Sequence, residues 1–270
     1  MPPLLKTTSK WTSFSSPPPL LSGEVHVWRV VVPGVDRTPP HWLGLLTAEE
    51  QARAAGKRIP LDARRTLTSR ACLRLLLGSY LDVPPASVAF TANATSKPQI
   101  ATPFAASPLE FNVSHSGDWV VLAFARGLPL GIDVEEHREL EFSEIVNAFF
   151  SPPEREIWST VPLPDHTSAF FSAWTRKEAY LKALGLGLFK ALDSFSVAFG
   201  PDPSSGLVWC ASDASAPQRW RIASIDLAPS YSCALAVGSA ASALQTFTFD
   251  PRSTLGGSRS SRPTPSDLPV

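Results

Sequence analysis

The sequence predicts an α+β protein built from two consecutive halves. Two observations carry this prediction: strand-type and helix-type hydrophobic periodicities recur in two similar batches, and the batches meet at a short link near residues 126–130. The residues of the two halves show no internal repeat, so the sequence by itself does not establish that one half is a duplicate of the other. We place the two halves at residues 24–127 and 128–249.

The first half begins with a strand and two helices. Apolar residues alternate over residues 24–32, which is the period of a half-buried strand. Thr47 is followed three residues later by Glu50, the capping-box spacing that starts a helix. A long helical stretch then spans residues 62–81. Its arginines are Arg64, Arg65, Arg70 and Arg74.

Three consecutive strands are predicted across the link between the halves. They cover residues 110–116, 119–125 and 130–135, and the turn at residues 116–118 is short enough for a hairpin. In the last of these strands, Asp133 and Glu135 are two residues apart and therefore share one face.

The second half continues with helices and ends with strands. Residues 141–150 are amphipathic at helical spacing, Ser151 and Glu154 start a second helix, and residues 164–184 form a third that stops at Gly185. Four strand-like runs follow at residues 195–199, 207–211, 219–225 and 231–237.

Both ends of the chain have the composition of disordered segments. Residues 1–23 are rich in Ser, Thr and Pro with no acidic residue, which also fits an organelle transit peptide, and residues 250–270 are rich in Pro, Gly and Ser. Between them, no apolar run approaches the roughly 18 residues that span a bilayer. We therefore expect a cytoplasmic protein, with organelle targeting by residues 1–23 as the alternative.

Composition excludes several classes of function. The net charge is zero, so no global field draws the 270-residue chain to nucleic acid or to an anionic membrane. The three cysteines, Cys72, Cys210 and Cys233, have no CxxC spacing, so neither zinc nor a disulfide framework is expected and they are interpreted as core residues.

Two acidic clusters carry the main functional signal. Asp133 and Glu135 lie in a strand flanked by apolar runs, and Glu178 lies on or beside the apolar stripe of a helix, four residues before Lys182. Three convergent carboxylates would repel one another and match the oxygen ligands of Mg²⁺. The alternatives are a solvated strand face for the first pair and an ordinary surface ion pair between Glu178 and Lys182.

Three further groups are candidate phosphate ligands. Ser114 and His115 are neighbours on a strand and point to opposite faces, so they suit ligand binding rather than a nucleophile–base pair; a structural histidine is the alternative. Lys97-Pro98 follows a loop and is a weak turn signal by itself. Lys57-Arg58 form a basic surface with the arginines of the next helix, which could dock a phosphate or be a solvated face.

Taken together, these segments resemble the 4′-phosphopantetheinyl transferases of the Sfp type over residues 24–240. Three motifs occur in the family's order: Phe-Asn-Val-Ser-His-Ser at 111–116, Gly-Ile-Asp-Val-Glu at 131–135 and Trp-Thr-Arg-Lys-Glu-Ala-Tyr-Leu-Lys at 174–182. Ser96 replaces the usual glycine before Lys97-Pro98. The resemblance implies two similar subdomains related by a pseudo-two-fold axis, with the active site in the cleft between them.

The resemblance also implies a reaction and its participants. Coenzyme A would be the co-substrate, with Mg²⁺ or alternatively Mn²⁺ on its pyrophosphate, and an apo acyl or peptidyl carrier protein would receive phosphopantetheine on a serine. Fatty-acid, polyketide and nonribosomal-peptide carriers are all candidates. A monomer would suffice, because both halves belong to one chain.

Residue roles follow from the resemblance. Asp133, Glu135 and Glu178 would hold the metal, with Glu178 also taking the serine proton directly or through a water. Lys182 would lie against the pyrophosphate and act on the leaving oxygen. The remaining expected coenzyme A ligands are Lys57, Arg58, Lys97, Pro98, Ser114, His115 and Lys177. One alternative is a different Mg²⁺-dependent phosphoryl transferase, but the sequence has no phosphate-binding Gly-rich loop. A second alternative is a non-catalytic module that only binds carrier proteins, but such a module would not need the three carboxylates.

Overall fold

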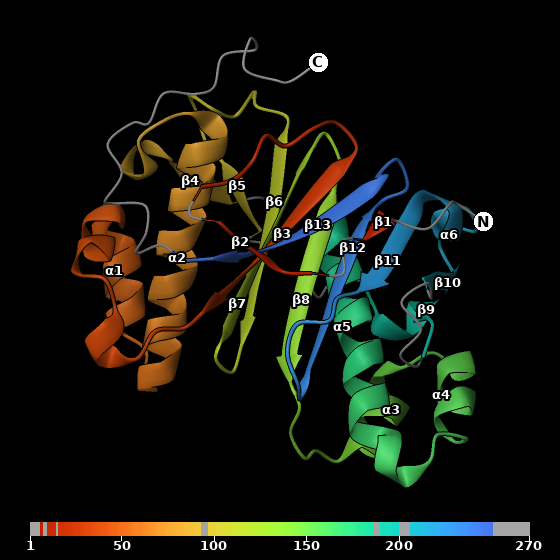
Figure 1. Ribbon diagram of the computed structural model, residues 1–270. Helices are drawn as coiled ribbons and strands as arrows, with labels where there is room; N and C mark the ends of the chain where they lie inside the picture. Colours follow the sequence, from red (N-terminus) through yellow and green to blue (C-terminus); the bar gives the residue numbers. More distant parts are fainter. Residues whose placement is uncertain are drawn as a thin grey trace.

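The computed structural model describes residues 6–7, 10–14, 16–92, 97–185, 190–199 and 206–250. Two sheets face each other, and one long helix covers the outer side of each (Figure 1). The α+β class predicted from the sequence is confirmed. No helix of the described part is long and apolar enough to cross a membrane.

The first sheet belongs mainly to the N-terminal half. Its strand order is β1-β13-β3-β7-β6, and β2 also pairs with β13. The strands are β1 (Lys6–Thr7), β2 (Thr12–Phe14), β3 (Glu24–Val31), β6 (Leu109–Ser116), β7 (Trp119–Arg126) and β13 (Ala243–Phe249). The predicted hairpin joins β6 to β7, with Gly117 at a φ of 52°.

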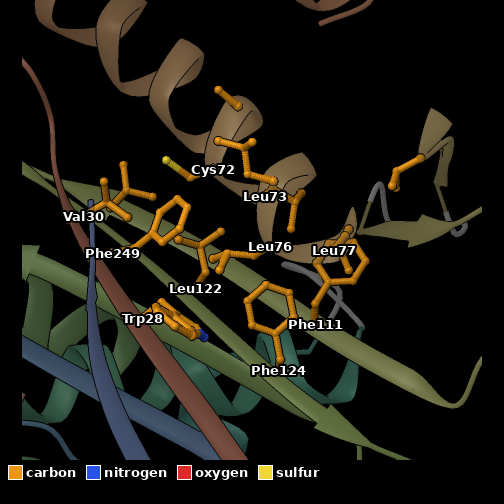
Figure 2. Close-up of a cluster of buried hydrophobic side chains, with 14 of the residues drawn as sticks. Trp28, Val30, Cys72, Leu73, Leu76, Leu77, Phe111, Leu122, Phe124 and Phe249 are labelled. Atoms are coloured by element: carbon orange, nitrogen blue, oxygen red, sulfur yellow. The ribbon is translucent and has the colours of Figure 1, made fainter. Parts of the chain in front are cut away.

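Helix α2 (Pro60–Leu81) packs on the outer face of this sheet, after the short helix α1 (Ala48–Ala55). Figure 2 shows Leu73, Leu76 and Leu77 of the helix against Leu122 and Phe124 of β7. The capping box at Thr47 and Glu50 forms as predicted. A small hairpin, β4 (Phe90–Ala92) with β5 (Pro98–Ile100), lies between α2 and β6 in the chain.

The second sheet has the order β11-β12-β8 and belongs to the C-terminal half. Its strands are β8 (Leu130–Glu136), β11 (Trp220–Ser224) and β12 (Tyr231–Gly238). Helix α5 (His166–Leu184) packs on β8 and β12 and ends at Gly185, whose φ of 65° is the left-handed C-cap predicted from the sequence. The remaining elements are α3 (Phe142–Phe149), α4 (Pro152–Trp158), β9 (Phe195–Val197), β10 (Leu207–Cys210) and α6 (Ala216–Arg219).

The inner faces of the two sheets form a shared core. Val27 and Val121 of the first sheet belong to the same buried cluster as Ile132 and Val134 of β8. Asp133 and Glu135 share the opposite face, as the sequence predicts, and this face is the one that α5 covers.

Two segments contribute strands to the first sheet although they lie outside the predicted N-terminal half. Strand β13, inside the expected second half of residues 128–249, pairs in parallel with β3 of the first half. Within residues 1–23, which the sequence predicts to be a disordered or targeting extension, β2 pairs with β13 and Trp11 Nε1 donates to Asp226 O at 2.7 Å. Residues 251–270 of the predicted tail lie outside the described part.

Stability should fall in mild acid because of His26. This side chain is fully buried, its Nδ1 lies 2.8 Å from Tyr80 Oη, and burial lowers its pKa to about 4. The unfolded chain binds the proton near pH 6.5, so the contribution is complete above that pH and is lost as pH falls to 4, about 3 kcal/mol in all. Urea unfolding at pH 7 and pH 4 measures it.

The matched variant is His26→Gln, which cannot titrate. Its unfolding free energy should fall by about 3 kcal/mol less than that of the wild type over the same interval. Equal losses in the two proteins would rule out His26 as the source.

Candidate functional site

The site is built on a seam where β6 and β8 run side by side without belonging to one sheet. Side chains at alternate positions of β6 bridge it. Asn112 Oδ1 accepts from Ile132 N at 2.9 Å, Ser114 Oγ donates to Asp133 Oδ1 at 2.9 Å, and Ser116 Oγ accepts from Glu136 N at 3.0 Å. Because residues two apart share a face, one strand can present all three.

Asp133 is the centre of a small ionic cluster at this seam. The residue is 4 % exposed, and its Oδ1 accepts from Lys182 Nζ at 2.6 Å as well as from Ser114. Lys182 Nζ also donates to Ser114 Oγ at 2.9 Å. The second oxygen, Oδ2, is buried and has no hydrogen-bond partner among the described residues. A buried carboxylate oxygen without a donor is costly, so this atom is suited to a cation.

Glu178 and Glu135 face the same cluster. The pKa of Glu178 is raised by burial first and then by the negative charge of Asp133, with a further rise from Glu135 and an opposing effect of Lys182. Glu135 Oε2 accepts from Ser116 Oγ and from Arg138 Nη1, each at 3.1 Å. The structure therefore brings the three predicted carboxylates within electrostatic reach of one another.

Asp133, Glu135 and Glu178 are not arranged as a complete metal-binding site. Within the described ranges, no three His, Cys, Asp or Glu side chains stand where they could hold a metal together. Lys182 supplies the positive charge beside Asp133 in the arrangement seen. The donor set of carboxylate oxygens, one of them unpartnered, nevertheless fits a hard divalent cation.

Gly131 allows α5 to approach β8 this closely. A Cβ at this position would overlap the backbone atoms Ala179 O and Ala183 N. Ala179 directly follows Glu178 and Ala183 directly follows Lys182, so this close approach lets both side chains reach the strand that carries Asp133.

A basic pocket lies on the other side of β6. His115 lines this cavity of about 260 Å³, and Ser69 Oγ is buried there with no hydrogen-bond partner in the part of the chain that the structure describes. The pKa of His115 is lowered by partial desolvation of the ring and by the positive charges of Arg65 and Lys182. The full lining is Arg53, Lys57, Thr66, Ser69, Arg70, Leu73, Val113 and His115.

This pocket separates residues that the sequence had grouped. Ser114 faces the carboxylates and His115 the basic pocket, so the two do not hold one ligand group together. Lys57 lines the pocket, whereas Arg58 is exposed and is not part of its lining. Sequence reasoning missed Arg53, Thr66 and Ser69 as lining residues, and the arginine-rich helix was the signal that pointed to Arg70.

Lys97 and Pro98 border a separate cavity of about 400 Å³ between the halves. Lys97 Nζ donates to Leu130 O at 3.1 Å and to Lys182 O at 3.0 Å, which ties the start of β8 to the end of α5. Burial lowers the pKa of Lys97, with Glu110 opposing the effect.

Lys177 is not brought to the site, contrary to the expectation that it binds coenzyme A. Its side chain is fully buried in the C-terminal half and forms an ion pair of 2.8 Å with Glu154. The pKa of Lys177 is lowered by burial, against the charge of Glu154.

The chain is similar to known proteins of one family. The sequence model of the 4′-phosphopantetheinyl transferase superfamily matches residues 129–236, and that of the 4′-phosphopantetheinyl transferase N-terminal region matches residues 38–126. The 4′-phosphopantetheinyl transferase HetI of Nostoc sp. is 35 % identical over 219 residues, covering 81 % of this chain and 88 % of HetI.

Two other similarities are shorter. The 4′-phosphopantetheinyl transferase Sfp of Bacillus subtilis is 33 % identical over 141 residues, covering 52 % of this chain and 61 % of Sfp. The crystal structure of the Thermotoga maritima holo-[acyl-carrier-protein] synthase aligns with a TM-score of 0.33 and 20 % identity, over 41 % of this chain and 62 % of that chain.

Substitution of Gly131 should destabilise the protein. In Gly131→Ala, the new methyl group must push α5 away from β8, at a cost of about 3 kcal/mol or more. Thermal unfolding measures the loss. Gly44→Ala is the matched control, because a Cβ there meets no atom of the described residues within 4 Å. If both variants unfolded at the same temperature, the close contact between helix and strand would be refuted.

Proposed function

The chain belongs to the 4′-phosphopantetheinyl transferase superfamily, Sfp type, whose members transfer phosphopantetheine from coenzyme A to carrier proteins, and we propose how its residues divide this work. In this proposal, the carboxylates at the β6–β8 seam hold the pyrophosphate end of coenzyme A through a metal, and the basic pocket binds its nucleotide end. The observation that carries the proposal is the buried, unpartnered Oδ2 of Asp133 beside two further carboxylates.

Asp133, Glu135 and Glu178 would hold Mg²⁺, or Mn²⁺ in its place. When bound, the ion would neutralise pyrophosphate charge and stabilise the charge that develops during transfer. Lys182 pairs with Asp133 in the arrangement seen, so it would have to turn toward the pyrophosphate when the metal takes over that charge.

The reaction forms one P–O bond and breaks another. The carrier serine hydroxyl attacks the β-phosphorus of coenzyme A, and adenosine 3′,5′-bisphosphate leaves. Glu178 would take the serine proton, directly or through a water, and Lys182 would stabilise or protonate the leaving oxygen. Ser114 would orient Lys182, to which its Oγ is bonded at 2.9 Å.

The basic pocket is suited to the 3′-phosphate of coenzyme A. Arg53, Lys57, Arg70 and His115 border one cavity, and a phosphate there would meet several donors. Ser69 Oγ, which is buried and unpaired within the described ranges, is a further donor for it. Lys97 and Pro98 would lie on the adenine side, and Lys97 would also keep α5 in place through its bond to Lys182 O.

One chain supplies both the carboxylates and the basic pocket, which supports a monomer as the active unit. The acceptor is proposed to be a free apo acyl or peptidyl carrier protein. Residues 24–127 and 128–249 remain the proposed halves, except that β13 belongs structurally to the first sheet.

Transfer should require the metal and two of the carboxylates. The wild type, incubated with coenzyme A, Mg²⁺ and a panel of apo carriers, should add one phosphopantetheine to a carrier, as weighed by mass spectrometry, and EDTA should stop the reaction. Glu178→Gln and Asp133→Ala should each lower the rate at least about a hundredfold with the fold intact. Glu156→Gln, at an exposed position of α4, is the control. Near wild-type turnover in either site variant would refute the assignment.

Lys57 and Arg58 should differ in their effect on coenzyme A. Lys57→Gln should raise the KM for coenzyme A about tenfold by removing one charged donor to phosphate, while Arg58→Gln should leave it unchanged. With dephospho-coenzyme A, which lacks the 3′-phosphate, the effect of Lys57→Gln should disappear. A KM increase of equal size with both substrates would place the 3′-phosphate elsewhere.

A further inference from the structure

Lys177 occupies a saturated polar site inside the C-terminal half. Its ammonium has three protons, and it makes three short contacts: Glu154 Oε2 at 2.8 Å, Leu192 O at 2.9 Å and Phe195 O at 2.8 Å. The Phe195 ring centroid lies 4.2 Å from Nζ and that of Phe150 lies 5.3 Å away. No proton is left over for a ligand.

Glu154 is equally well satisfied on its side. Oε2 accepts from Ser151 N and Ser151 Oγ, both at 2.8 Å, in addition to Lys177, and Oε1 accepts from Val197 N at 2.8 Å. The pair therefore links α5 to the start of α4 and to β9. Both side chains are at most 1 % exposed, so water could not replace these hydrogen bonds if α5 rotated out of place.

The position of Lys177 in the helix gives this pair a functional consequence. Lys177 precedes Glu178, and successive side chains of an α-helix are turned by about 100°. When Lys177 is held in the core, the rotation of α5 about its axis is defined, and Glu178 and Lys182 are turned toward Asp133. Gly131 sets how closely the helix approaches the strand, and Lys177 sets its rotation.

We propose that Lys177 is a positioning residue for phosphopantetheine transfer, anchoring α5 through Glu154 so that Glu178 and Lys182 face the β6–β8 seam, rather than a ligand of coenzyme A. This role rests on the proposed function of Glu178 and Lys182. It is distinct from that function, because Lys177 would touch neither substrate nor metal.

The test is a pair of substitutions and their combination. Lys177→Met removes the charge at similar length and leaves the Glu154 carboxylate buried and unpaired, so the melting temperature should fall by roughly 10 °C. The kcat for transfer should fall about tenfold to a hundredfold because the Glu178 carboxylate is misplaced. The KM for coenzyme A should stay within about twofold of wild type.

Adding Glu154→Gln to Lys177→Met removes the stranded charge. The double variant should then have a higher melting temperature and a higher kcat than Lys177→Met. Its fold-loss in kcat should be smaller than the product of the fold-losses measured for Lys177→Met and for Glu154→Gln alone. Glu154→Asp, which keeps both charges but shortens the carboxylate, should lower kcat without changing the KM, and it serves if Lys177→Met does not fold. Arg155→Gln, at the neighbouring position of α4, is the control.

Three results would overturn the proposal. They are a large rise in the KM for coenzyme A in Lys177→Met with kcat retained, strictly multiplicative losses in the double variant, or wild-type kinetics in all variants. If the wild type transferred nothing to any carrier, the proposed function would fail instead, and the melting temperatures would still report whether the Lys177–Glu154 anchor exists.

Discussion

The seam between β6 and β8 is the constraint on which the rest of the site depends. The two strands belong to different sheets, so backbone hydrogen bonds do not hold them together, and polar side chains take that role. Asn112 is buried and bonds the backbone of Ile132, which sets the alignment of the strands. The remaining contacts, at Ser114 and Ser116, fall on the residues that carry the carboxylates. The same side chains therefore join the halves and build the site.

Charge is divided between the two faces of β6. Carboxylates gather on the side of β8 and α5, while the arginines and lysine of the basic pocket gather on the side of α2. Like charges on each side repel one another and favour a ligand of opposite charge. A single molecule with a metal-bound pyrophosphate at one end and a phosphate at the other would satisfy both. The neutral total charge of the chain conceals this separation.

Two lysines of the same helix illustrate how burial decides a role. Lys182 is partly exposed at the seam, where its charge remains available to a ligand, whereas Lys177 is enclosed by Glu154, backbone carbonyls and aromatic rings. An enclosed ammonium with every proton bonded cannot be redirected without breaking bonds that water would not replace. Sequence spacing does not distinguish the two lysines, since Lys177 is next to Glu178 and Lys182 is one helical turn away from it.

The sequence alone was sufficient for the elements with strong periodicity, for the shared face of Asp133 and Glu135, and for the family, because these depend on neighbours along the chain. Only the tertiary structure decided which strands lie together. It placed β13 and β2, the strand that follows Trp11, in the first sheet. The composition of residues 1–23 suggested disorder, but a strand at a sheet edge is stabilised by a partner that is distant in the sequence. It also put Ser114 beside the carboxylates and His115 in the basic pocket, and it buried Lys177. Alternation along a strand or helix defines the direction of a side chain, but only the elements packed against it determine what that side chain meets.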